Sequence, residues 1–355
     1  MGNTVMKTAG IHHITALVKD AQRNVDFYAG VLGLRLVKKT VNFDAPEVYH
    51  LYFGNEQGSP GTVITFFPYE SSRKGRIGAG QVGVTTYAVP VGALDYWKER
   101  LTKLDISFSE ITRFSENYIR FFDHDGLLLE IVEREEGTLS TWSFSGIPAD
   151  KAIKGFGGAV LYSHASEKTA RVLEEVLGLE KVGQDGEFIR YKAEGDRGNL
   201  IDLNAESMEW GNSGSGTVHH IAWRAKDNED HEAWRSHVEQ SGFHPTPIID
   251  RQYFHAIYFR EEGGILFEIA TDPPGFAVDE PEDHLGEALM LCRHGSKAGV
   301  LKLRRSCPLL KCGNWSKSNN ETSLSTRFKP EFAHIPLIAW YGRNGARFIA
   351  GRSND

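Results

Sequence analysis

Two segments of the sequence each occur twice, and this internal repetition restricts the fold more than any other feature. Val31-Leu32-Gly33-Leu34 recurs as Val176-Leu177-Gly178-Leu179, in both places after a helical pattern and before a strand pattern. Residues 125–132 recur in similar form as residues 263–270. Repetition of this kind indicates a fold built from copies of one supersecondary unit. The chain therefore divides into four modules, each expected to contain a strand, a helix and three further strands.

The four modules predict how the chain is divided into domains. We expect one pair of modules at residues 9–137 and a second pair at residues 157–289. Residues 138–156, rich in serine and glycine and without periodicity, are expected to link the two pairs. Residues 290–355 form a basic tail that lacks the repeated pattern, and we expect it to be poorly ordered or separately docked. Four βαβββ modules predict an α+β protein with two paired, cup-like mixed sheets.

The first module shows the local signals most clearly. Asp20 is expected to cap a helix that carries Val25, Tyr28 and Val31 on one face. Gly33 follows at the position where a helix commonly ends in a left-handed residue. In the strand before this helix, Ile14 begins an alternation of apolar side chains that is typical of a strand packed under a helix.

The composition is that of an ordinary soluble globular protein, with 40% hydrophobic and 25% charged residues. A net charge of -7 offers no basic surface for nucleic acid, and no apolar run is as long as a membrane span. The N-terminal residues lack the pattern of a secretory signal. All three cysteines lie near the C-terminus, so the preceding chain has no disulfide framework, which suits a reducing cytoplasm.

Two pairs of histidines and one glutamate stand out against the apolar strands. His12-His13 begins module one, His219-His220 begins module four, and Glu268 lies in the last strand of module four. Because successive strand side chains point to opposite faces, His13, His220 and Glu268 all fall on the face away from the helices. A single strand histidine is usually structural, but two imidazoles and a carboxylate are the facial triad of non-haem Fe(II) oxygenases. We predict a metal site here, for Fe(II) or for Mn(II).

The distribution of these candidate ligands also predicts which modules share a cup. Module one supplies His13 but no carboxylate in its last strand, whereas module four supplies His220 and Glu268. One metal can bind all three residues only if modules one and four face each other. Modules two and three begin without histidine and are expected to form a metal-free cup, in which Glu130 and Asp202 are structural residues or relics.

With these residues in place, the chain resembles the vicinal oxygen chelate superfamily, and within it the hydroquinone-type ring-cleaving dioxygenases. The resemblance covers roughly residues 10–289 and rests on the histidine pairs, Thr15, Asp250-Arg251, Tyr258 and Phe267-Glu268-Ile269. It implies an Fe(II) enzyme whose substrates are a small aromatic diol and O2. After residue 289 the chain departs from the family's pattern, and our hypothesis is a reading-frame change in the gene. The resemblance also implies catalytic roles around the metal for His12, Thr15, His219, Arg251 and Tyr258.

These five residues have both catalytic and structural interpretations. We predict that Tyr258 hydrogen-bonds a substrate oxygen, that Arg251 stabilises negative charge, and that His219 or His12 moves protons. The structural alternatives are orientation of the ligand imidazoles by His12 and Thr15, and a strand-surface ion pair for Arg251.

Two other functions stay open at the level of sequence. One is a metal-dependent isomerase or lyase of glyoxalase type, which usually has a fourth protein ligand that module one does not offer. The other is a non-enzymatic protein that sequesters small molecules, which needs a cup but no metal. The sequence alone does not separate hydroquinones from catechols, and it leaves the oligomeric state open, a homo-oligomer included.

Overall fold

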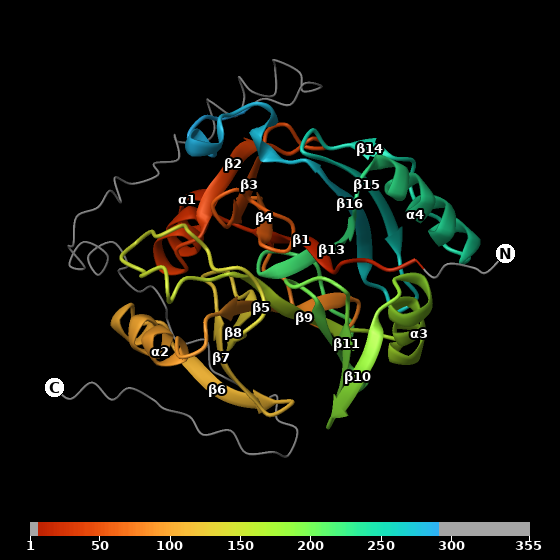
Figure 1. Ribbon diagram of the computed structural model, residues 1–355, viewed down its shortest axis with the longest axis horizontal. Helices are drawn as coiled ribbons and strands as arrows, with labels where there is room; N and C mark the ends of the chain where they lie inside the picture. The colour runs from red at the N-terminus through yellow and green to blue at the C-terminus, as the bar shows by residue number, and fades with distance from the viewer. Residues whose placement is uncertain (1–5, 291–355) are drawn as a thin grey trace.

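The computed structural model describes residues 6–290 and contains two eight-stranded mixed sheets, each strongly curled (Figure 1). The predicted poorly ordered tail lies, apart from Met290, outside the described residues. The first sheet has the order β14-β15-β16-β13-β1-β4-β3-β2. Its strands are β1 (Ile11–Val18), β2 (Arg35–Val41), β3 (Tyr49–Gly54), β4 (Val63–Pro68), β13 (Thr217–Ala225), β14 (Ile249–Asp250), β15 (Phe254–Arg260) and β16 (Leu266–Pro274).

The second sheet repeats this arrangement with the order β10-β11-β12-β9-β5-β8-β7-β6. Modules one and four therefore form one cup and modules two and three form the other, as the positions of the candidate ligands predicted. The strands of the second sheet are β5 (Gln81–Val89), β6 (Phe108–Arg113), β7 (Glu116–Phe122), β8 (Leu128–Glu133), β9 (Gly155–Tyr162), β10 (Glu180–Asp185), β11 (Phe188–Lys192) and β12 (Leu200–Asn204).

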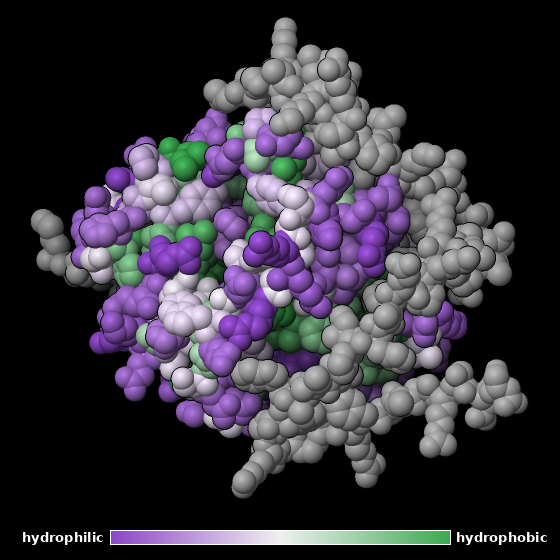
Figure 2. Space-filling view, turned by 180° about the vertical axis from the view of Figure 1, so that it is seen from behind, coloured by the Kyte–Doolittle hydropathy of each residue, from purple (hydrophilic) through white to green (hydrophobic). Residues whose placement is uncertain are grey.

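The longer helices lie at the periphery of the two sheets (Figure 1). They are α1 (Ala21–Val25), continued by the π-helical η1 (Asp26–Val31), α2 (Leu94–Lys103), α3 (Ser166–Arg171), continued by η2 (Val172–Val176), and α4 (Asn228–Gln240). Two 3-10 turns, η3 (Phe276–Val278) and η4 (Glu282–His284), follow β16. Hydrophilic residues cover most of the described surface on the face in Figure 2. Among residues 6–290, no helix is long and apolar enough to cross a membrane.

The first helix begins as predicted but does not continue as a regular α-helix. The Asp20 side chain accepts a hydrogen bond from the Arg23 backbone N–H, which caps α1. The chain then widens, and the Leu32 N–H donates to the Phe27 carbonyl, five residues back. The same widening occurs in module three, so both copies of the repeated Val-Leu-Gly-Leu segment begin at the last residue of a π-helical turn. In each copy the glycine has a φ of 71°, which is the left-handed ending expected for Gly33.

The two central strand pairs contain β-bulges at equivalent places. Where β1 pairs with β13, His12 is the extra residue of β1 and His219 is the extra residue of β13. In the second sheet the extra residues are Gly83 in β5 and Gly157 in β9. A bulge bends a strand and redirects its side chains, and bulges are frequent beside active sites. Both predicted histidine pairs therefore lie at β-bulges. The equivalent bulges of the second sheet contain glycine instead of histidine.

The alternation predicted for β1 is present in the packing. Ile14, Ala16 and Val18 belong to the large apolar core beneath the helices, and each is fully buried. His13 and Thr15 face the inside of the cup, where they line a cavity. The sheet thus places apolar side chains on its convex face and polar groups within its concave face.

The second cup is filled by its own charged side chains. Glu130 is fully buried and pairs with Arg113 and Arg120, at 3.0 Å and 2.5 Å. Asp202 pairs with Arg113 at 2.6 Å and with Arg190 at 2.7 Å. Burial raises the pKa of Glu130, but the two arginines outweigh burial and hold it at about 2. These contacts support the structural interpretation of Glu130 and Asp202.

Acid should therefore weaken the fold through Glu130. Because its pKa is lower in the folded chain than the usual 4.5, its contribution is full above pH 4.5 and is lost as the pH falls towards 2. Replacement of Arg113 by methionine should lower the free energy of unfolding at neutral pH by about 3 kcal/mol, because it removes one partner of a buried ion pair. Urea titrations at several pH values check this; a difference between the two proteins that stays constant down to pH 2 would contradict the assignment.

Candidate metal centre

Three side chains from opposite ends of the chain meet inside the first cup. The candidate ligand atoms of His13, His220 and Glu268 all lie within 4.8 Å of one another. The Nε2 atoms of His13 and His220 lie 3.3 Å and 2.8 Å from Oε2 of Glu268, and 3.4 Å from each other. The structure therefore brings together the residues that the sequence predicted as metal ligands.

The surroundings of Glu268 fit a cation. Its side chain is fully buried, and neither carboxylate oxygen has a hydrogen-bond donor in suitable geometry among the described residues. A buried carboxylate without donors is costly unless a positive charge compensates it. Two imidazoles and this carboxylate are a donor set suited to Fe(II) or Mn(II).

The ring nitrogen of each candidate ligand histidine that points away from the site, Nδ1, is hydrogen-bonded to the preceding histidine in the sequence. His12 Nδ1 lies 2.9 Å from His13 Nδ1, and His219 Nδ1 lies 2.8 Å from His220 Nδ1. His12 Nε2 also lies 3.1 Å from the Thr271 carbonyl, which can only accept, so that nitrogen carries the proton. A neutral His12 then accepts at Nδ1 from His13, and the lone pair of His13 Nε2 is left for a metal. Such orienting bonds are typical of ligand histidines.

The two neighbours differ in their access to solvent. His12 is buried, and burial lowers its pKa well below the usual range. His219 is exposed at the rim of the cavity, and desolvation together with His220 lowers its pKa to about 4. Both imidazoles are therefore neutral near pH 7, which suits the orienting hydrogen bonds.

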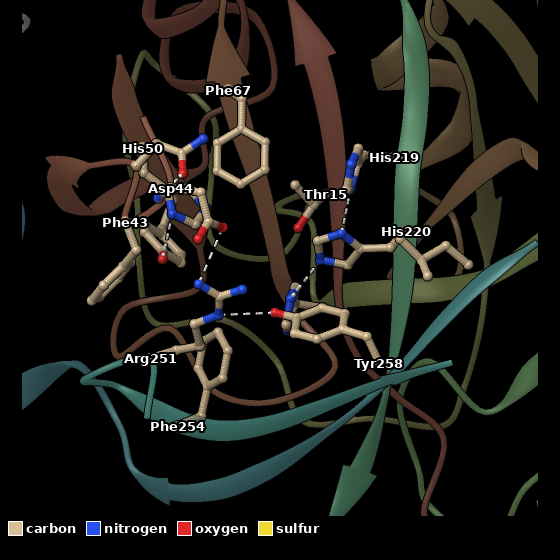
Figure 3. A pocket seen from close by; sticks show the side chains of 14 residues that line it. Thr15, Phe43, Asp44, His50, Phe67, His219, His220, Arg251, Phe254 and Tyr258 are labelled. Atoms are coloured by element: carbon tan, nitrogen blue, oxygen red, sulfur yellow. Dashed lines mark hydrogen bonds and ion pairs between the residues drawn. The ribbon is translucent and has the colours of Figure 1, made fainter. Parts of the chain in front are cut away.

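A cavity of about 200 Å³ adjoins the candidate ligands (Figure 3). In Figure 3 the side chains of His219, His220 and Tyr258 form one side, whereas Phe43, Asp44 and His50 lie opposite. Its size and mixture of aromatic and polar side chains suit a small aromatic molecule. The lining residues are His13, Thr15, Asn42, Phe43, Asp44, His50, Tyr52, Phe67, His219, His220, Arg251, Phe254, Tyr258 and Leu266.

Arg251 and Tyr258, both predicted from the sequence, form one hydrogen-bonded pair in this cavity. Arg251 Nε donates to the Tyr258 hydroxyl at 3.2 Å, and its guanidinium lies over the Tyr258 ring. Burial and the charge of Glu268 raise the pKa of Tyr258 well above its usual range, so it is a neutral donor. Arg251 Nη1 also lies 3.3 Å from exposed Asp44, across the cup. Arg251 thus faces the cavity and also makes the surface ion pair considered as its alternative.

The segment after β16 fixes the loop that carries Arg251. Asp279 accepts hydrogen bonds from Gln252 Nε2 at 2.6 Å and from the Tyr253 hydroxyl at 3.0 Å. Its other oxygen pairs with Lys38 of β2 at 2.6 Å. Gln252 has a φ of 70°, an uncommon backbone conformation for a residue other than glycine. Figure 1 shows this segment, in blue, crossing towards the β2 side of the sheet.

Sequence reasoning missed a group of residues on the opposite wall, chiefly His50. His50 Nε2 lies 2.9 Å from Thr65 Oγ1, and His50 Nδ1 lies 2.7 Å from the Tyr52 hydroxyl. Thr65 in turn bonds Thr15 at 2.9 Å, which links the missed residues to a predicted one. A signal was present in β3, where buried Leu51 alternates with His50 and Tyr52.

Comparison with known proteins identifies the family. The family model described as the Glyoxalase/Bleomycin resistance protein/Dioxygenase superfamily matches residues 10–131 and 156–269. The chain belongs to this superfamily. The match confirms the resemblance found in the sequence, and its two parts cover strands of both cups.

Relatives within the superfamily are named as dioxygenases. MhqO of Bacillus subtilis, named as a ring-cleaving dioxygenase, is 60% identical over 285 residues, which are 80% of this chain and 91% of MhqO. The chlorohydroquinone/hydroquinone 1,2-dioxygenase of Sphingobium indicum is 37% identical over 79% of this chain and 90% of its own. A crystal structure of a protein named as a dioxygenase from Bacillus subtilis matches with a TM-score of 0.83 and 57% identity, over 84% of this chain and 96% of that chain.

Proposed function

We propose that this enzyme is a ring-cleaving dioxygenase that opens an aromatic diol of hydroquinone type with O2. Its metal is Fe(II), with Mn(II) as the alternative, held by His13, His220 and Glu268. The observation that carries the proposal is the buried carboxylate of Glu268, which faces two oriented imidazoles beside a cavity of about 200 Å³. The names of the relatives support the reaction. The distribution of cysteines supports a cytoplasmic location.

The side chains around the cavity account for how a diol would be held. Phe67, Phe254 and Phe43 offer faces and edges to a flat ring. Tyr258 is kept protonated by its burial and by the charge of Glu268, and Arg251 orients its hydroxyl, so Tyr258 donates a hydrogen bond to the diol oxygen beside the ligands. The bound metal supplies a Lewis acid that favours the ionised diol and a site for O2.

The remaining predicted residues would stabilise charge, transfer protons or orient the ligand histidines. The Arg251 guanidinium stabilises negative charge that develops on the opening ring, because it is largely buried, lines the cavity and bonds Tyr258. His219 combines a neutral ring with an exposed position, so it can exchange a proton between the diol and water. His12 is less accessible, and its bond to His13 suits an orienting role. Thr15 is buried as well and bonds Thr65 rather than a ligand imidazole.

The rival isomerase is disfavoured by the residue at the fourth-ligand position. Glu268 pairs with Ala222, two residues after His220, and Thr65 pairs with Thr15, two residues after His13. Thr65 is therefore the module-one counterpart of Glu268, and a threonine hydroxyl is a poor metal ligand beside a carboxylate. The Thr65 hydroxyl instead forms hydrogen bonds with Thr15 and His50.

An oxygen-uptake assay tests the proposed function. Protein stripped with a chelator should consume no O2, and anaerobic loading with Fe(II) should restore one O2 consumed per hydroquinone opened. A parallel sample loaded with Mn(II) distinguishes the two metals. The variant His244→Ala, which removes an exposed histidine that does not line the cavity, is the matched control and should retain full activity. Isomerisation of a glutathione hemithioacetal without O2 uptake would overturn the proposal in favour of the rival.

A further inference from the structure

The short turn that carries Arg251 has a strained backbone. It connects β14 to β15, and Arg251 and Phe254 at its two ends both line the cavity (Figure 3). The Arg251 N–H donates to the Phe254 carbonyl at 2.9 Å, which closes the turn. Gln252 within it has a φ of 70°, a costly conformation for a residue that has a Cβ. Such a turn persists only where surrounding contacts hold it.

The contacts of the Arg251 side chain do not supply this support. Its guanidinium pairs with Asp44 at 3.3 Å, but the Asp44 side chain is 79% exposed, and an exposed ion pair contributes little to stability. Its bond to the Tyr258 hydroxyl, at 3.2 Å, forms only where the backbone brings the guanidinium into reach. The position of Arg251 therefore depends on what holds the turn.

Asp279, which follows η3, binds the middle of the turn. Its Oδ2 accepts hydrogen bonds from Gln252 Nε2 at 2.6 Å and from the Tyr253 hydroxyl at 3.0 Å. These two residues lie between Arg251 and Phe254, so one carboxylate oxygen fixes the segment that separates the two cavity residues. Hydrogen bonds to a charged acceptor are stronger than those between neutral groups. Asp279 is therefore well suited to hold the strained turn.

Lys38 of β2 in turn holds Asp279. Its Nζ lies 2.6 Å from Asp279 Oδ1 and 2.5 Å from Glu280 Oε2, and its side chain is fully buried. A buried ammonium group is costly unless it is paired, so this lysine requires both carboxylates. The two carboxylates differ in their other partners. Glu280 accepts from the backbone N–H groups of Gly286 and Ala288 in its own segment, whereas Asp279 binds the turn.

We infer that Asp279 is a positioning residue for catalysis. It holds the turn so that Arg251 reaches the Tyr258 hydroxyl and the substrate oxygen, and Lys38 of module one fixes Asp279. This inference rests on the proposed function for the task of Arg251. A misplacement of about 1 Å can lower a rate by about 100-fold, so the support of the turn matters for turnover. Through this contact, module one acts on an arginine of module four.

Two neighbouring truncations test this role, because each removes one carboxylate beside Lys38 and only Asp279 touches the turn. In the metal-loaded full-length enzyme, Asp279→Ala should lower kcat for hydroquinone by about tenfold or more, because a small shift of Arg251 is enough for such a loss. KM should change much less, since Arg251 acts on charge that develops during the reaction. Glu280→Ala should weaken the fold but keep the wild-type kcat.

Further variants separate positioning from a general loosening of the fold. Asp279→Ala combined with Arg251→Met should lose no more activity than Arg251→Met alone, because both changes act through one side chain. Asp279→Asn should recover most of the kcat, since its amide can accept from Lys38 and donate to the Tyr253 hydroxyl. If Asp279→Ala does not fold, Gln252→Met with Tyr253→Phe removes the same bonds from the side of the turn and should give the same loss.

Cleavage by trypsin after Arg251 provides a readout that does not depend on turnover. The rate at which a protease cuts a folded chain follows how often the segment opens. Peptides that end at Arg251, identified by mass spectrometry, should form about tenfold faster in Asp279→Ala than in the wild-type protein, as expected for the loss of hydrogen bonds to a charged group. Glu280→Ala should leave the rate of this cut unchanged.

The two readouts distinguish this inference from the proposed function. Oxygen uptake by the wild-type enzyme, with kcat and cleavage after Arg251 unchanged in Asp279→Ala, would overturn the inference and leave the function intact. Losses that multiply in the variant lacking both Asp279 and Arg251 would also overturn it. No O2 uptake by the wild-type enzyme, with cleavage accelerated only in Asp279→Ala, would overturn the function and retain Asp279 as the residue that holds Arg251.

Discussion

Replacement of Glu268 by glutamine should reduce the affinity for Fe(II) by about 100-fold or more, and abolish O2 uptake at ordinary metal concentrations. Glutamine keeps the shape of the side chain but removes the negative charge that compensates the cation. The metal-free variant should be as stable as the metal-free wild-type protein or more stable. The reason is that the fully buried carboxylate has no hydrogen-bond donor in suitable geometry among the described residues.

Glu130→Gln is the matched control for this prediction, because Glu130 holds the corresponding place in module two. It should retain full metal binding yet unfold more readily, since its carboxylate pairs with Arg113 and Arg120. Metal analysis after dialysis and thermal unfolding with and without metal provide the two readouts. A Glu268→Gln protein that keeps its metal, or that loses stability as Glu130→Gln does, would identify Glu268 as a structural residue.

Replacement of His219 by alanine should lower kcat, measured at saturating metal, by about 100-fold or more, as expected when a proton-transfer group is removed. The same change removes the hydrogen-bond partner of His220 Nδ1, 2.8 Å away, so metal affinity should also fall, by about tenfold. His219→Asn separates the two effects. Its amide oxygen can accept from His220 and restore metal affinity, but it cannot carry a proton, so kcat should stay low.

The readouts for His219 are metal affinity and kcat per bound metal. Recovery of both in His219→Asn would reduce the role of His219 to orientation of His220. If His219→Ala binds metal normally and turns over at the wild-type rate, neither role is correct.

The pairing of modules could be predicted because a single metal site requires its ligands to come together. His13 and His220 lie in different modules, and one metal can join them only if those modules share a sheet, which the strand order confirms. The alternation of β1 likewise predicted which side chains reach the cup. Both predictions need only the order of residues along a strand and the number of candidate ligands in each module. The sequence gives both directly.

Other features depend on contacts that no local pattern reveals. Strict alternation puts His12 and His13 on opposite faces, yet the bulge at His12 brings their nitrogens within 2.9 Å. The tautomer of His12 follows from the Thr271 carbonyl, which is distant in the sequence. The widened turn after α1 has no signal in the apolar spacing. His50 was missed for another reason, since it is a single histidine with no second copy in the repeats.

Diffraction from crystals loaded anaerobically with Mn(II), recorded so that the metal gives an anomalous signal, tests the central claim most directly. The account predicts one strong peak within bonding distance of the Nε2 atoms of His13 and His220 and a carboxylate oxygen of Glu268. The peak should be lost in Glu268→Gln crystals. A peak at another place in the chain, with these three side chains unchanged around an empty centre, would contradict it.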